Sequence, residues 1–187
     1  MSSSVKSLIR AGRLGAVLTA LALPAALALP AALAAAPVLA EGRPSARTSA
    51  AVNCFVNGVR QPGPEIVGTA GGDDIACDVL DPGDVIHGLG GDDTIRVTDN
   101  NHGVVNGEGG VDDIFLPTNR GLVQGGAGND TIQVNTNTGP NGGAQGHVRG
   151  GDGDDNITVR DNFGLVEGNA GFDTCSVTTG NLPLCEA

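Results

Sequence analysis

The chain has 187 residues, a formal net charge of −11, 31 glycines and no Trp or Tyr. This acidity excludes nucleic acid as a partner, because binding phosphates needs a basic face, and it disfavours electrostatic attachment to anionic lipid. With only four Phe, the chain can build only a thin core of Ile, Val and Leu.

The first forty residues predict a signal peptide, residues 1–40. A basic start that ends at Arg13 precedes the uncharged, Ala/Leu-rich stretch 14–39, and small residues lead to Ala40. We expect Sec-type export of the bacterial kind, cleavage after Ala40 and a secreted product that is not an integral membrane protein. The alternative is an uncleaved anchor, because the apolar stretch is long enough to span a bilayer.

The segment after the cleavage point, residues 41–51, is polar and predicted to be a disordered leader. Residues 52–67 are predicted to form an N-terminal cap. All 21 acids lie after Ala40, against seven Arg and no Lys, so the exported chain has a net charge of −14.

A nine-residue pattern then recurs six times within residues 68–177, with Gly first, Gly fourth, Asp sixth and an apolar residue eighth. The first glycines are Gly68, Gly88, Gly107, Gly125, Gly150 and Gly168. The fourth-position glycines are Gly71, Gly91, Gly110, Gly128, Gly153 and Gly171. The sixth-position acids are Asp73, Asp93, Asp112, Asp130, Asp155 and Asp173. The eighth position holds Ile75, Ile95, Ile114, Ile132, Ile157 and Cys175.

The spacing of these acids predicts a stack of coils. Successive acids are 20, 19, 18, 25 and 18 residues apart, and about 18 residues suit one strand, a turn, a return strand and a second turn. The fold predicted is a right-handed parallel β-roll or β-helix solenoid of about six coils. The long coil carries its extra residues near 135–146, as a loop on the edge opposite the acids.

The glycine turns and their acids indicate calcium. Glycine allows a tight turn whose carbonyl oxygens point to one side, and the Asp adds a carboxylate. Calcium takes about 6–8 oxygen ligands, which two stacked turns about 4.8 Å apart can supply together. Six turns leave five gaps, so we expect up to five Ca²⁺ ions along one edge.

The pattern resembles the RTX (haemolysin-type) calcium-binding repeat, GGxGxDxUx, over roughly residues 66–177. The resemblance implies a parallel β-roll with calcium held by the sixth-position Asp side chains and by turn carbonyls. Family arrays often repeat every nine residues with metal on both edges, whereas here the motif recurs at about twice that interval. We therefore expect metal on one edge only.

Four cysteines in an exported chain suggest two disulfides. Cys77 and Cys175 would lie five coils apart, or roughly 24 Å at about 4.8 Å per coil, which is far beyond disulfide reach. We therefore expect the pairs Cys54–Cys77 and Cys175–Cys185, one at each end, with residues 178–187 as the C-terminal cap.

Nothing in the sequence supports an enzyme, because the adjacent acids that four of the motifs contain should diverge and the three His occupy unrelated repeat positions. The predicted function is calcium binding that couples folding to extracellular calcium, in a monomer. The alternative is a calcium-dependent adhesive protein with a cell-surface or matrix partner. Ice binding is weaker, since Thr94, Thr131 and Thr158 do not share one motif position.

Overall fold

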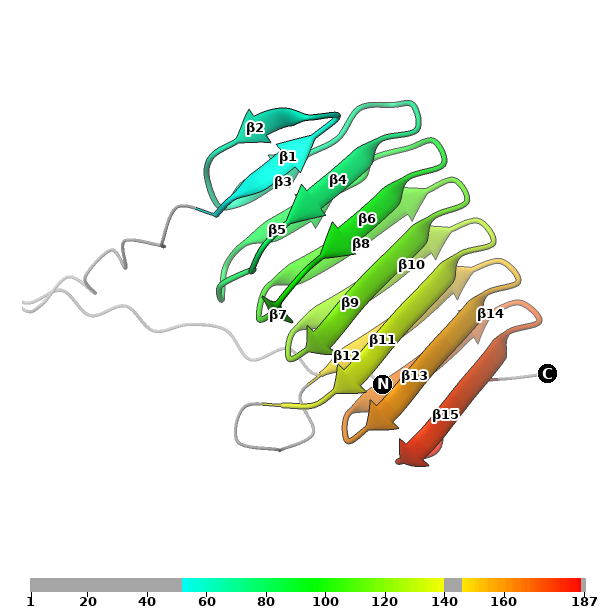
Figure 1. Ribbon diagram of the computed structural model, residues 1–187. Helices are drawn as coiled ribbons and strands as arrows, with labels where there is room; N and C mark the ends of the chain where they lie inside the picture. The colour runs from blue at the N-terminus through cyan, green and yellow to red at the C-terminus, as the bar shows by residue number, and fades with distance from the viewer. Residues whose placement is uncertain (1–51, 140–145, 186–187) are drawn as a thin grey trace, which may run out of the picture. The chain divides into compact units, whose positions relative to one another are not determined.

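The computed structural model describes residues 52–139 and 146–185, which form a parallel β-solenoid (Figure 1). The predicted signal peptide and leader lie outside these residues, as does part of the predicted loop. In the described ranges there is no helix, and hence none that is long and apolar enough to cross a membrane.

Fifteen strands make up two sheets. The strands in chain order are β1 Cys54–Val56, β2 Val59–Gln61, β3 Glu65–Val67, β4 Asp74–Cys77, β5 Val85–His87, β6 Thr94–Val97, β7 Asn100–Asn101, β8 Val104–Gly109, β9 Asp113–Asn119, β10 Leu122–Ala127, β11 Thr131–Asn137, β12 His147–Asp152, β13 Asn156–Asn162, β14 Leu165–Ala170 and β15 Thr174–Gly180.

The outgoing strands form one sheet and the return strands the other. The nine-stranded sheet has the order β15-β13-β11-β9-β6-β4-β1-β2, with β7 beside β9, and the six-stranded sheet has the order β14-β12-β10-β8-β5-β3. Neighbouring coils pair in parallel, and the same motif positions face each other, as in the Ile132 pairs with Ile114 and Ile157. The predicted β-solenoid of about six coils is confirmed.

The core is a column of branched apolar residues between the two sheets. Ile at the eighth motif position is 0–2 % exposed, and the return strands contribute one buried residue each, such as Val105 and Val123. The flanking strand residues point outward because side chains alternate along a strand. By the same alternation, the Asp at the sixth motif position, two residues before the Ile, also points inward.

The insertion between the fourth and fifth motifs does not disturb the stack. β11 and β13 pair in register from Thr131 with Asn156 to Asn137 with Asn162, although the coil between them is seven residues longer than an 18-residue one. β11 ends at Asn137 and β12 begins at His147, so the strands on both sides of the predicted loop keep their register.

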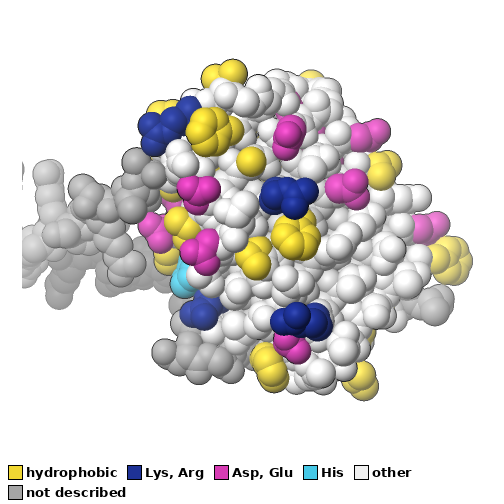
Figure 2. All heavy atoms as spheres, in the orientation of Figure 1, with side chains coloured by type: hydrophobic (Ala, Val, Ile, Leu, Met, Phe, Trp, Pro, Cys, Tyr) yellow, Lys and Arg dark blue, Asp and Glu magenta, His cyan; other side chains and the backbone are white. Residues whose placement is uncertain are grey.

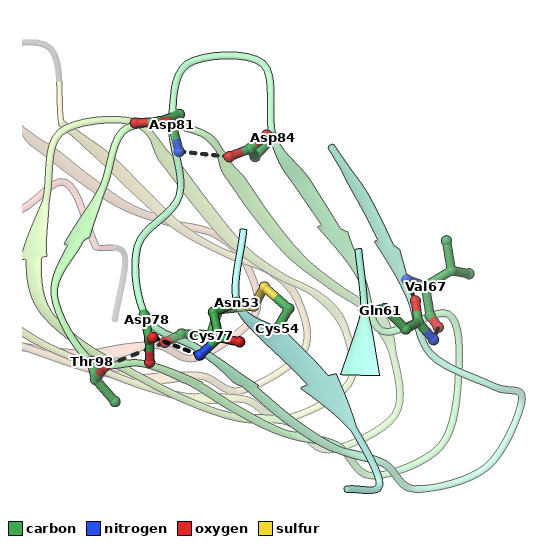
Figure 3. The surroundings of a disulfide bond; sticks show 9 residues. All are labelled: Asn53, Cys54, Gln61, Val67, Cys77, Asp78, Asp81, Asp84 and Thr98. Carbon is green, nitrogen blue, oxygen red and sulfur yellow. Dashed lines mark hydrogen bonds between the residues drawn. A yellow bond between two sulfur atoms is a disulfide. The ribbon is translucent and has the colours of Figure 1, made fainter. Parts of the chain in front are cut away.

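The N-terminal end is covered by an antiparallel hairpin. β1 pairs with β2 and also with β4, where Cys54 faces Cys77 and is joined to it by a disulfide (Figure 3). Beside this bond, the side-chain amide of Asn53 donates a hydrogen bond to Asp78 at 2.9 Å. β3 lies within the range expected for the cap, but it pairs in parallel with β5 and begins the second sheet.

A second disulfide, Cys175–Cys185, joins β15 to the C-terminal segment at the other end. The backbone of Leu184 pairs with Glu167, so the C-terminal segment lies along β14. Both predicted cysteine pairs are thus confirmed.

Candidate functional site

The six sixth-position aspartates form a single buried row along one edge of the solenoid. Their exposed fractions run from 0 % at Asp112 to 8 % at Asp173. Each side chain points inward because it precedes an outgoing strand by one residue and shares the inward phase of the Ile that follows. Where a second acid is adjacent in the sequence, as Asp113 is to Asp112, that neighbour is exposed, as expected for adjacent residues that diverge.

In every aspartate of the row except Asp73, one carboxylate oxygen joins two coils. The backbone N–H of Asp112 donates to Asp130 Oδ1 at 2.9 Å, and Asp130 in turn donates to Asp155 Oδ1 at 2.8 Å. The same bond recurs along the row at 2.8–3.0 Å, so that the acids are linked in the order Asp73, Asp93, Asp112, Asp130, Asp155 and Asp173.

The other oxygen has no partner in five of the six carboxylates. Within residues 52–139 and 146–185, no hydrogen-bond donor reaches the buried Oδ2 atoms of Asp93, Asp112, Asp130, Asp155 and Asp173. A buried anionic oxygen without a partner is costly, since it has lost its water and gained nothing in return. A row of five such atoms is therefore a set of acceptors to which a cation or a proton can bind.

The first glycine of each motif leaves space beside this free oxygen. A Cβ added to Gly125 would come closer than 3.0 Å to Asp130 Oδ2 and to the carbonyl oxygen of Gly150 on the next coil. The same arrangement recurs at Gly68, Gly88, Gly107 and Gly150. At each of them an added Cβ would lie close to a carboxylate oxygen of the same coil and to a carbonyl oxygen of the following coil. Oxygens from two coils thus converge where these motifs have no side chain.

The turns need left-handed backbone angles at two motif positions. The fourth-position Gly128 has φ +134°, and its Cβ would collide with the carbonyl of Gly110. In every motif but the first, the second position is also left-handed, and in three of these motifs it holds a residue other than glycine: Leu89 at +78°, Glu108 at +76° and Asn169 at +79°. These three turns hold a conformation that residues other than glycine adopt only at a cost.

Burial raises the pKa values of the acids in the middle of the row. The pKa rises from 3.8 to about 6 for Asp93 and Asp155 and to about 7 for Asp130. Desolvation is the largest cause, the N–H bond to Oδ1 opposes it, and the neighbouring acids add repulsion. Burial also raises the pKa of Asp112.

The two ends of the row differ. At the N-terminal end Asp73 is satisfied, because Asn57 of the hairpin donates to its Oδ1 at 2.5 Å and Thr69 donates to its Oδ2. The backbone bond from Thr69 is the main reason why the pKa of Asp73 is lowered. Asp173 ends the row at the last coil, with its Oδ2 unpartnered among the described residues. The hairpin therefore caps one end only.

The donor set suits a hard cation, because it consists of carboxylate and carbonyl oxygens. In the described part of the chain, no three His, Cys, Asp or Glu side chains cluster as a group that could hold a metal ion. An ion between two coils would accordingly have to draw part of its shell from backbone carbonyls and water. This agrees with the ligands that the repeat resemblance implies.

The opposite edge carries a second ladder, made of asparagines, which the nine-residue pattern does not include. The amide of Asn101 donates to Asn119 Oδ1, Asn119 to Asn137 and Asn137 to Asn162, each at 2.9 Å, and all four are 0 % exposed. Their spacings of 18, 18 and 25 residues follow those of the acids, which is the signal that could have identified them. This ladder is uncharged, and its side chains bond to one another.

Two of the three histidines have carboxylate partners. The ring of His87 lies 2.6 Å from Glu108, and that of His147 lies 2.7 Å from Glu167. Both pairs sit on the outer face of the six-stranded sheet, half-buried and outside the row of acids. Glu167 also accepts from Arg149, and the His147 bond is the main reason why its pKa is lowered.

The charged side chains on the outer face of the nine-stranded sheet are scattered among polar ones and form no basic patch (Figure 2).

Comparison of the chain with protein-family models, with curated proteins and with solved structures found no match.

Proposed function

We propose that this chain is an exported calcium-binding protein of the RTX type, in which Ca²⁺ binds along the aspartate edge. The observation that carries the proposal is the row of buried, unpartnered Oδ2 atoms, each beside the first glycine of its motif. At Gly88, Gly107, Gly125 and Gly150 a carbonyl oxygen of the next coil lies there as well. The six aspartates would hold the ions through their carboxylates. The first- and fourth-position glycines would hold them through their backbone carbonyls.

A bound divalent cation would supply the positive charge that the row lacks. Two unit charges 4 Å apart repel by about 4 kcal/mol at an effective dielectric of 20. Without metal, the row opposes a core that contains few large apolar residues. Calcium would remove this opposition, so that folding depends on calcium and is favoured outside the cell, where its concentration is high.

The size of the effect follows from mass action. A ligand that binds only the folded state at 100 times its dissociation constant stabilises that state by about 2.7 kcal/mol per site. Extracellular calcium modules have dissociation constants of about 10⁻⁴–10⁻³ M. Several sites in a row can therefore determine whether the chain is folded.

The test is calcium titration of the chain from Glu41 with its disulfides intact. Calorimetry should count up to five ions, and far-UV circular dichroism should gain β signal with calcium and not with magnesium. No heat of binding from calcium would refute the proposal. Binding to a chain already folded in chelator would retain the metal site but refute the coupling to folding.

A groove on the outer face of the six-stranded sheet favours a second function, binding to a cell surface or matrix. It has a volume of about 470 Å³ and lies over Gly126 and Gly151, beside Asn106, Gln124 and Arg149. Its amide and guanidinium groups suit a hydroxyl-rich ligand. Retention of the chain on cell-wall polysaccharide in calcium, and its release by chelator, would support this function, and no retention in either condition would exclude it.

A further inference from the structure

The last strand of the solenoid is an open edge. β15 ends the nine-stranded sheet, and among the described residues only β13 pairs with it (Figure 1). Its seven residues, Thr174–Gly180, include no charged residue and no proline. A long, uncharged edge strand is a template for pairing with another strand.

The other end of this sheet is protected. β2 is its terminal strand, has only three residues, contains Arg60 and is followed by Pro62. Short length, charge and proline are the features that keep sheet edges from associating. The two ends of the same sheet therefore differ in their capacity to accept a strand.

The core is also incomplete at β15. Cys175 and Val177 are only partly buried, whereas their partners on β13, Ile157 and Val159, are 0 % exposed. The turn that leads into β15 exposes Phe172 by 77 %. A further strand beside β15 would cover the inward side chains as each inner strand does for its neighbour.

We propose that two copies of this chain associate through β15, which pairs antiparallel with the β15 of the second copy. A two-fold axis at Val177, the middle of the strand, places Ser176 opposite Thr178 of the other copy. Hydroxyl side chains are favourable cross-strand partners. An axis perpendicular to the sheet keeps Cys175 and Val177 of both copies on the core side.

Charge repulsion between two copies is weakest at β15. The chain from Glu41 has seven Arg against 21 acids, so two copies repel each other through most of their surface. β15 presents no charge to its own image. Because the β2 end is protected, pairing at β15 closes after two copies and does not extend into a filament.

This dimer does not rest on calcium binding, and it gives a different mass from the monomer that the sequence analysis expects. The strands and both disulfides lie between Val52 and Cys185, so the chain from Glu41 contains the whole folded unit. Its mass should be measured by sedimentation equilibrium in calcium, from about 1 μM to about 1 mM, the range of moderate to weak association. Circular dichroism of each sample separates loss of fold from loss of association.

We expect a concentration-dependent dimer. The double variant Ser176→Lys/Thr178→Lys should weaken it at least tenfold, since Lys then faces Lys across the axis twice, and both positions are exposed in one copy. The matched control is Thr158→Lys on β13, which together with Arg160 puts the same two cations one strand away from the edge. The control should dimerise like the parent.

Hydrogen exchange gives a second readout, because the β15 amides should be more protected in the parent at high concentration than in the double variant. A parent chain that remains monomeric over the whole range refutes the proposal. A dimer that the double variant leaves unchanged also refutes it, since the copies would then meet elsewhere.

Discussion

Asp112 donates its backbone N–H to Asp130 Oδ1 at 2.9 Å, while the Oδ2 atom of the same Asp130 carboxylate is buried and unpartnered within the described structure. One oxygen thus stabilises the stack, and the other destabilises it until something binds there. The chemistry proposed for this protein follows from that division within a single side chain.

Replacing Asp130 by Asn should remove metal without removing the ladder. The amide oxygen can still accept the Asp112 N–H, but the charge is lost. We expect calorimetry to count at least one ion fewer and the chain in chelator to be no less stable than the parent. Asp113→Asn, which alters an exposed acid on β9, is the control, and it should bind like the parent. Equal stoichiometry in all three chains would contradict the assignment of Asp130.

Gly125→Ala should destabilise the fold with or without calcium. The new methyl group would collide with Asp130 Oδ2 and with the Gly150 carbonyl. Overpacking of this kind costs about 1–3 kcal/mol. Gly109→Ala is the control, because its methyl would meet its nearest atom at 3.8 Å. The measurement is the urea concentration at which half of each variant is unfolded. Equal midpoints for the two variants would show that the space beside the carboxylate is not restricted.

In chelator, the chain should become more stable as the pH falls from about 7 toward 3.8. The raised pKa values of Asp93, Asp130 and Asp155, about 6 to about 7, mean that the folded state binds protons where the unfolded state, near 3.8, has released them. Stability therefore falls as pH rises through this window. Thermal midpoints measured from pH 4 to pH 8 test the sign, and a midpoint that rises with pH would contradict it.

Calcium affinity should have the opposite dependence in the same window. Protons and Ca²⁺ would compete for the same Oδ2 atoms, so apparent affinity should fall on acidification from about pH 7. Calcium titrations at pH 5 and pH 7.5 test this expectation. Equal affinity at the two values would place the bound ions away from these carboxylates.

Leu89→Gly should stabilise the chain by about 1 kcal/mol, because it relieves a left-handed conformation at φ +78°. Leu89 is 42 % exposed, so little apolar burial is lost. Val111→Gly, at an exposed position of the next turn that is not left-handed, should instead destabilise it through chain entropy. Free energies of unfolding in calcium distinguish the two, and a destabilised Leu89→Gly would show that the Leu side chain contributes more than its conformation costs.

Asn119→Ala should cost on the order of 2–3 kcal/mol. It removes an amide that donates to Asn137 and accepts from Asn101 and from the Gly121 N–H. Asn100→Ala alters a neighbouring amide bonded only to Asp99 and should cost little. If both variants unfold at the same denaturant concentration, the buried amide ladder does not stabilise the edge opposite the acids.

Much of the fold could be predicted because each coil repeats the same residue pattern in the sequence. The recurrence of Gly, Gly, Asp and Ile placed Ile132 above Ile114 and kept the long coil in register, and the separation of the coils selected the two cysteine pairs. The nine-residue pattern ends before the last residues of the outgoing strands, which reach Asn119, Asn137 and Asn162, where the buried Asn ladder holds their ends.

Some features depended on contacts between coils. The sequence indicated that Asp130 was a ligand, but not that one of its oxygens already accepts the N–H of Asp112. Nor did it distinguish Leu89 and Glu108, which hold left-handed turns without glycine, from ordinary surface residues. The carboxylate partners of His87 and His147 were missed because they lie 21 and 20 residues away in the chain.

The sequence by itself determined the coil length, the inward phase of each acid and Ile, and the ends at which the cysteines meet, because each follows from a local periodicity. Only the tertiary structure decided which carboxylate oxygen is free, that the opposite edge is tied by asparagines, and that β15 is left open while β2 is protected. These features depend on which atoms of one coil face those of the next, and a repeat pattern specifies that coils stack without specifying the bonds they exchange.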